Sequence, residues 1–112
     1  MVMETILRKN IRDINSDELR TLGTQISTFL GDISLSVKCT LKSNRLVVLG
    51  EHSADMAIDT ESVLGHLERN IQALQIQFTQ HVRLYLRHVG QKQPYAYRQF
   101  ALAPPPQPPH RK

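Results

Sequence analysis

Hydrophobic residues recur along this chain with two different periods, and the places where the period changes delimit the predicted elements. After the cap-type sequence at residues 15–18, apolar side chains follow at helical spacing as far as Leu30, and Gly31 is a typical helix stop. From Ile33 to Leu41 every second residue is apolar, which is typical of a half-buried strand. The pattern therefore predicts a helix followed by a strand.

The same two periods continue to the end of the second strand pair. The remaining predicted elements are a turn at 42–44, a strand at 45–51, a helix over 59–74, a strand at 82–87, a turn at 90–94 and a strand at 95–102. The predicted order is therefore helix-strand-strand, twice.

An internal repeat is predicted from the positions of the apolar residues. Shifted by 45 residues, the apolar positions of the first half fall on apolar positions of the second: Leu19, Leu22, Ile26, Phe29, Ile33, Val37, Cys39 and Leu41 on Leu64, Leu67, Ile71, Leu74, Phe78, Val82, Leu84 and Leu86. The match keeps its phase through the loop and into the strand, which favours a pseudo-repeat of α-β-β. We predict an α+β fold, a two-layer sandwich with a four-stranded, mostly antiparallel sheet and two helices on one face.

Three parts of the chain are distinguished by composition. Residues 1–14 form an N-terminal segment whose apolar stripe could make a helix, packed either on the domain or on a partner or membrane surface. Residues 15–102 form the α-β-β-α-β-β domain. Residues 103–112 are rich in proline and are predicted to be a disordered tail, whose sequence at 106–111 also fits the P-x-x-P-x-R pattern of groove-bound peptides.

The last strand pair carries the residues that bear on function. Val82, Leu84 and Leu86 alternate with polar side chains, so the helices should cover one face of the sheet and leave the other uncovered. The predicted partner-binding residues of the uncovered face are Arg83, Tyr85, Arg87, Tyr95 and Tyr97, supported by Lys92 in the turn and Lys38 in the first strand. Ser36, Thr40 and Arg45 are predicted to extend this face.

This strand pair resembles a pattern found in small uncharacterised cyanobacterial α-β-β domains. The resemblance lies in Val82-Arg83-Leu84-Tyr85-Leu86-Arg87, followed by Gly90 and then by Pro94, Tyr97 and Phe100. Tyr97 stands where those domains favour Trp. The resemblance implies an α-β-β unit of the kind often joined to membrane or signalling segments, and it implies no activity.

Charge is divided unevenly between the two parts of the chain. All ten acidic residues lie at or before Glu68, where seven basic residues leave a net charge of −3. From Arg69 onward there are seven Lys or Arg and no acid, so that part carries +7. A one-signed part of this kind either attracts anionic partners or serves only as a solvated surface.

Cysteine content and hydropathy indicate where the protein resides. Cys39 is the only cysteine, so no internal disulfide can form, which fits a reducing cytoplasm. No apolar run is long enough for a membrane span, and there is no signal-peptide core. We predict a cytoplasmic protein.

Catalytic signatures are absent from the sequence. There is no Gly-rich phosphate loop, nucleophile elbow or paired-histidine metal motif, and Cys39 at an inward strand position is predicted to be a small hydrophobe. Glu51, His52, Asp55 and Asp59 form the densest ionisable cluster. It could hold a metal or act in acid–base chemistry, but loop polarity and helix capping by Asp59 account for it better. We predict no metal, no cofactor, no small-molecule substrate and no enzymatic activity.

Two kinds of partner fit a basic, tyrosine-bearing sheet face. Tyr and Arg are common anchors of protein interfaces, so a protein partner or self-association is the favoured hypothesis. Rings between cations can also stack on unpaired bases, so single-stranded RNA or DNA is the alternative. A third interpretation is that the tyrosines only stabilise the hairpin.

Overall fold

The computed structural model describes residues 6–30 and 35–102 and confirms the predicted α+β class. The elements in chain order are η1 (Ile11–Asp13), α2 (Ser16–Thr28), β1 (Ser36–Lys42), β2 (Arg45–His52), α3 (Thr60–Ala73), β3 (His81–His88) and β4 (Ala96–Ala101). Gly31 and the tail at 103–112 lie outside the described residues, so the predictions made for them stay predictions.

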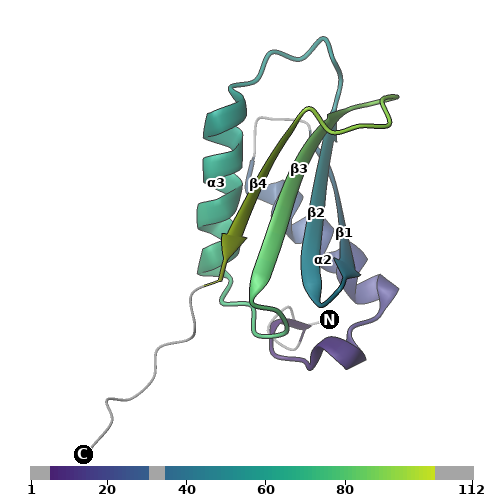
Figure 1. Cartoon of the computed structure of the whole chain (residues 1–112), viewed down its shortest axis with the longest axis vertical. Helices are drawn as coiled ribbons and strands as arrows, with labels where there is room; N and C mark the ends of the chain where they lie inside the picture. The colour runs from purple at the N-terminus through teal and green to yellow at the C-terminus, as the bar shows by residue number, and fades with distance from the viewer. Residues whose placement is uncertain (1–5, 31–34, 103–112) are drawn as a thin grey trace, which may run out of the picture.

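The four strands form one mixed sheet in the order β1-β2-β3-β4 (Figure 1). Both hairpins are antiparallel, and the two hairpins join through the parallel pair β2–β3. A parallel pair needs a crossover connection, and here α3 supplies it. The sheet is mostly antiparallel, as predicted, and the element order is α-β-β twice. The pseudo-repeat itself remains a prediction.

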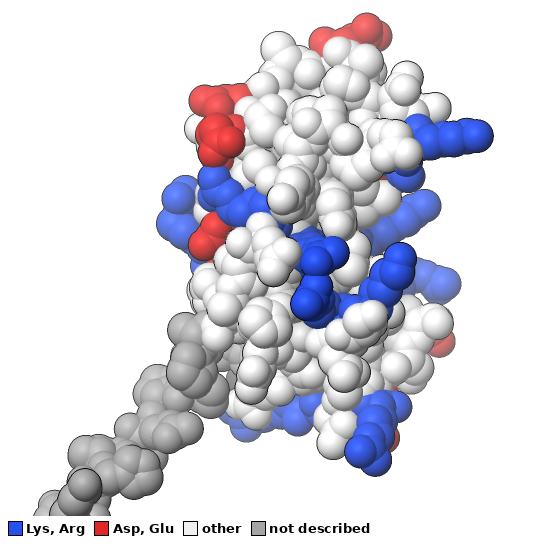
Figure 2. All heavy atoms as spheres, in the orientation of Figure 1, with Lys and Arg blue, Asp and Glu red and all other residues white. Residues whose placement is uncertain are grey.

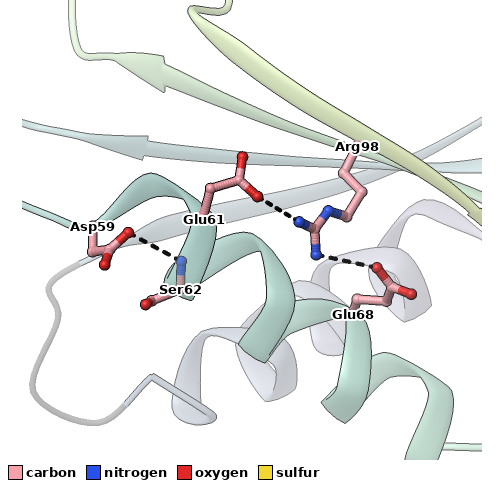
Figure 3. Close-up of polar contacts among 5 residues, drawn as sticks. All are labelled: Asp59, Glu61, Ser62, Glu68 and Arg98. Carbon is pink, nitrogen blue, oxygen red and sulfur yellow. Dashed lines mark hydrogen bonds and ion pairs between the residues drawn. The ribbon is translucent and has the colours of Figure 1, made fainter.

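Side-chain caps begin both helices where the sequence predicts them. The Asn15 side chain accepts a hydrogen bond from the backbone N–H of Glu18, and the Glu18 side chain accepts one from the backbone N–H of Asn15. The Asp59 carboxylate caps α3 by accepting from the backbone N–H of Ser62 (Figure 3). The reciprocal pair of bonds at α2 and the single bond at α3 satisfy N–H groups that a helix start otherwise leaves without partners.

The N-terminal segment packs on the domain over the part that the structure describes. Ile6 and Leu7 are buried, and Lys9 forms an ion pair with Glu18, with 2.6 Å between Nζ and Oε2. Hydrogen bonding from Lys9 lowers the pKa of the Glu18 carboxyl, although burial acts in the opposite direction. Within residues 6–14, Ile6 and Leu7 are helical and the 3-10 turn η1 follows, and the rest of the predicted helix, at residues 1–5, lies outside the described residues.

The core lies on one face of the sheet, beneath the two helices. In Figure 1, α2 lies behind β1 and β2, and α3 lies beside β4. Apart from Ile6 of the N-terminal segment, the most completely buried side chains come from both helices and from the central strands: Leu22, Ile26, Leu64, Leu67, Ile71, Leu46, Val48, Val82, Leu84 and Leu86. The inward and outward positions of β3 are therefore as predicted.

One cation of the basic part points toward the helices. Arg98 of β4 makes ion pairs with Glu61 at 2.7 Å and Glu68 at 3.3 Å, both on α3 (Figure 3). This side chain is thus neutralised within the chain and ties β4 to α3. Among the described residues no helix combines the length and the apolar character that crossing a bilayer requires.

Candidate functional site

The face of the sheet opposite the helices, which we call the open face, is built from cross-strand rows of side chains. Register pairs Lys38 with Leu49, Leu49 with Tyr85, and Tyr85 with Tyr97, so one row crosses all four strands. The next row is Thr40, Val47, Arg83 and Gln99. Alternation along each strand sends these residues away from the buried positions. The sequence-predicted residues Lys38, Arg83, Tyr85 and Tyr97 are therefore brought together.

Two tyrosines lie side by side in the first of these rows. The ring centroids of Tyr85 and Tyr97 are 6.0 Å apart, with 31° between the ring planes. Tyr97 is 66% exposed, whereas Tyr85 is partly buried between its neighbours. Arg83 Nε donates to Gln99 Oε1 at 3.2 Å in the adjacent row, which orients the guanidinium beside the rings. The result is an uncovered aromatic pair with a cation next to it.

Arg87 lies on the open face but is not a free cation. Its Nε and Nη2 both donate to Glu51 Oε2, at 3.1 and 2.7 Å, and both side chains are mostly shielded from solvent. A partner would have to break this ion pair to use the charge of Arg87. Arg87 therefore stabilises the β2–β3 pairing, and its predicted role in direct binding has less support than that of Arg83.

Tyr95 is placed differently from the prediction. It lies before the start of β4, and its hydroxyl is 2.6 Å from His52 Nε2. Its ring stacks on His88, with centroids 4.4 Å apart and 23° between planes. His52 is buried. His52 follows the outward residue Glu51 and His88 follows the outward residue Arg87, so both histidines occupy inward positions of their strands. Tyr95 thus closes the end of the hairpin and does not join the Tyr85–Tyr97 pair, so the prediction that it shares their side was wrong.

A hollow of about 340 Å³ adjoins the tyrosine pair, and we call it the cationic hollow. It is lined by Lys42, Ser43, Arg45, Val47, Arg83 and Tyr85. Ser43 and Asn44 both have positive φ, at 52° and 63°, so the chain reverses in two residues and sets Lys42 opposite Arg45. A smaller hollow of about 190 Å³, lined by Arg83, Tyr85, Tyr97 and Gln99, continues from it.

The surface view shows how charge is distributed over this side of the molecule. Figure 2 shows Lys and Arg gathered across the middle and right of the face, with acidic side chains mainly toward the upper left and top. Lys92, predicted as a supporting residue, is exposed in the turn between β3 and β4, outside the rows of the open face. Sequence reasoning missed Lys42 and gave Arg45 only a secondary place. The sequence feature that could have indicated both residues is the short turn at 42–45, which sets Lys42 opposite Arg45.

The ionisable loop cluster is divided by the fold. Glu51 pairs with Arg87 on the open face, whereas the ring of His52 is buried and bonds to Tyr95 and to the Ser53 carbonyl. Asp59 caps α3. In residues 6–30 and 35–102, no group of three or more His, Cys, Asp or Glu side chains could hold a metal ion.

Cys39 of β1 is buried in the core, as the alternating pattern predicts. Burial raises the pKa of its thiol to about 12, so the nucleophilic thiolate is essentially absent at neutral pH. We expect Cys39 in the folded protein to resist alkylation by iodoacetamide at pH 8, and to react readily once urea unfolds the chain. Mass spectrometry of the two samples measures this difference. Fast labelling of the native protein would contradict the buried position.

No protein-family model, no curated protein and no solved structure matches this chain. The functional argument therefore depends on the geometry of the open face and on its charges.

Proposed function

We propose that this protein is a non-catalytic binding or assembly module that acts through its open face. The observation that carries the proposal is the row Lys38–Leu49–Tyr85–Tyr97, which crosses the sheet on the side away from both helices. An uncovered sheet face with large aromatic side chains is the kind of surface that partners bury. A cytoplasmic location is part of the proposal and is supported by the single, reduced Cys39.

A protein is one candidate occupant. Val47 and Leu49 give the open face an apolar centre beside the tyrosines, and cations surround it, which resembles the core and rim of a protein interface. Lys38, Lys42 and Arg45 beside this centre are all positive, so a second copy would present charges of the same sign. Like charges in contact are unfavourable, so this geometry favours a partner with an acidic surface.

Single-stranded nucleic acid is the second candidate, and one specific observation favours it. The cationic hollow opens directly beside the exposed tyrosine pair, so phosphate-binding and base-stacking groups are adjacent.

Loss of the tyrosine rings should abolish binding without unfolding the domain. We expect the double variant Tyr85→Ala and Tyr97→Ala to fail to retain the partner that co-purifies with the tagged protein from its own cell extract. The reason is that aromatic anchors commonly contribute about 2 kcal/mol or more each to an interface. Quantitative mass spectrometry of the eluates measures the loss.

The matched control removes an exposed apolar side chain elsewhere. Val89 is 65% exposed in the turn after β3, so Val89→Ala should keep the partner. Circular dichroism should show both variants folded. Undiminished retention by the tyrosine double variant would refute the open face as the binding surface.

A further inference from the structure

The cations of the cationic hollow differ from the other arginines of the sheet in their pairing. Arg87 and Arg98 are each bound to carboxylates of this chain. Within the described residues, no carboxylate lies within ion-pair distance of Lys42, Arg45 or Arg83. Three positive charges are thus held together at one place with no internal counter-charge. Their mutual repulsion is relieved when an anion binds between them.

The arrangement of the lining residues indicates what anion would fit. Lys42 and Arg45 lie opposite each other at the end of the first hairpin, and Arg83 enters from the neighbouring strand β3. Arginine donors suit the oxygens of a phosphate, and the Ser43 hydroxyl on the same wall can donate as well. A phosphate group is therefore the anion that matches these donors.

The second hollow supplies the other half of a nucleotide site. Arg83 and Tyr85 line both hollows, so the phosphate donors and the ring pair lie next to each other. The rings of Tyr85 and Tyr97 offer stacking surfaces that accept any base. Gln99 Oε1 is occupied by Arg83, which leaves the amide nitrogen of Gln99 able to donate to a base edge.

We infer that the open face binds a single-stranded nucleic acid, with successive backbone phosphates at Lys42, Arg45 and Arg83 of the cationic hollow and adjacent bases on Tyr85 and Tyr97. This inference rests on the proposed function and names its partner. A single strand is specified because the faces of bases in a duplex are covered by the base pairs stacked above and below them, which leaves no face free to stack on a side chain. Every nucleotide carries both a phosphate and a planar base, whereas an acidic side chain carries a charge and no ring, so the combination of the two hollows favours the nucleic acid.

Fluorescence anisotropy with a labelled oligothymidylate of about 12 nucleotides, within the length that one sheet-based domain spans, tests the inference on the full chain. Three phosphate contacts predict a slope of log K against log salt near −2. The affinity should therefore fall roughly 20-fold between 50 and 200 mM salt. A duplex of the same length should bind more weakly at every salt concentration.

Two sets of variants separate the roles of charge and rings. Lys42→Glu with Arg45→Glu should weaken binding and reduce the magnitude of the salt slope by about 1.4. Tyr85→Leu or Tyr97→Leu should weaken binding about fivefold or more and leave the salt slope unchanged. The charge variants alter a turn at the surface, so they keep the test valid if a tyrosine variant fails to fold.

The matched control is Arg12→Glu with Arg69→Glu, which changes the net charge equally at two exposed positions outside the sheet. The loss of affinity for the oligonucleotide in this control should be at most half of the loss in the Lys42→Glu, Arg45→Glu variant. Equal loss in both, equal affinity for the duplex, or no binding at 50 mM salt would overturn the inference.

The outcomes of these experiments distinguish a failure of this inference from a failure of the proposed function. If no oligonucleotide binds but a protein partner is retained and lost with the two tyrosines, the open face remains a binding surface and only the nucleic-acid assignment is wrong. If neither binds, both are wrong.

Discussion

Replacing Leu84 with Ala is expected to lower the free energy of unfolding by about 2–5 kcal/mol. Leu84 lies at the centre of β3 on the helix-covered side and is 1% exposed. Its removal leaves a cavity in the core between the sheet and the helices that the surrounding side chains can fill only partly. Urea denaturation measures the loss as a lower midpoint with an unchanged slope.

The control for this prediction is on the other side of the sheet. Leu49 belongs to the open face and is only partly buried, so Leu49→Ala should cost less than half as much. The comparison tests which face forms the core. Equal losses at Leu49 and Leu84 would mean that the open face is covered in solution, which would remove the proposed binding surface.

Gly23→Ala is expected to destabilise the protein by about 1–2 kcal/mol even though Ala is the better helix former. A Cβ atom at Gly23 would lie 2.9 Å from the Val37 carbonyl oxygen and 3.5 Å from the Val37 carbonyl carbon. These are backbone atoms of β1 and cannot rotate away, so α2 would have to move back from the sheet. Thermal and urea unfolding measure the change.

Gly65→Ala in α3 is the matched control and should have the opposite sign. There a Cβ would meet only the ends of two flexible side chains, Arg69 at 3.4 Å and Arg98 at 3.5 Å. The helix gains up to about 1 kcal/mol because Ala loses less backbone entropy than Gly. A gain in stability in both variants would contradict the close approach of α2 to the backbone of β1.

The fold class and the inward side of each strand could be predicted because they follow from local periodicity. The two-residue period of a strand and the apolar stripe of a helix determine which side chains face the core. Neither depends on which strand lies alongside. The caps at Asn15 and Asp59 were predictable for the same reason, since a cap uses residues within one turn.

The details of the site depended on contacts between distant segments. Arg87 pairs with Glu51 only because β2 and β3 run parallel in one particular register, and periodicity does not specify that register. Tyr95 precedes the regular strand, so alternation no longer governs its ring, and His52 and His88 determine where the ring packs. The cationic hollow needed the same register to bring Arg83 beside the turn at Lys42 and Arg45.

The parallel pairing of β2 with β3 also has a consequence for the order in which the molecule is made. Glu51 and Arg87, which meet across this pair, are separated by 36 residues, and α3 lies between them. A ribosome therefore releases the first hairpin with the β2 edge unpaired, and that edge waits until β3 has emerged. We expect the sheet to close late in synthesis, so a chain interrupted after α3 would expose β2 to pairing with other chains.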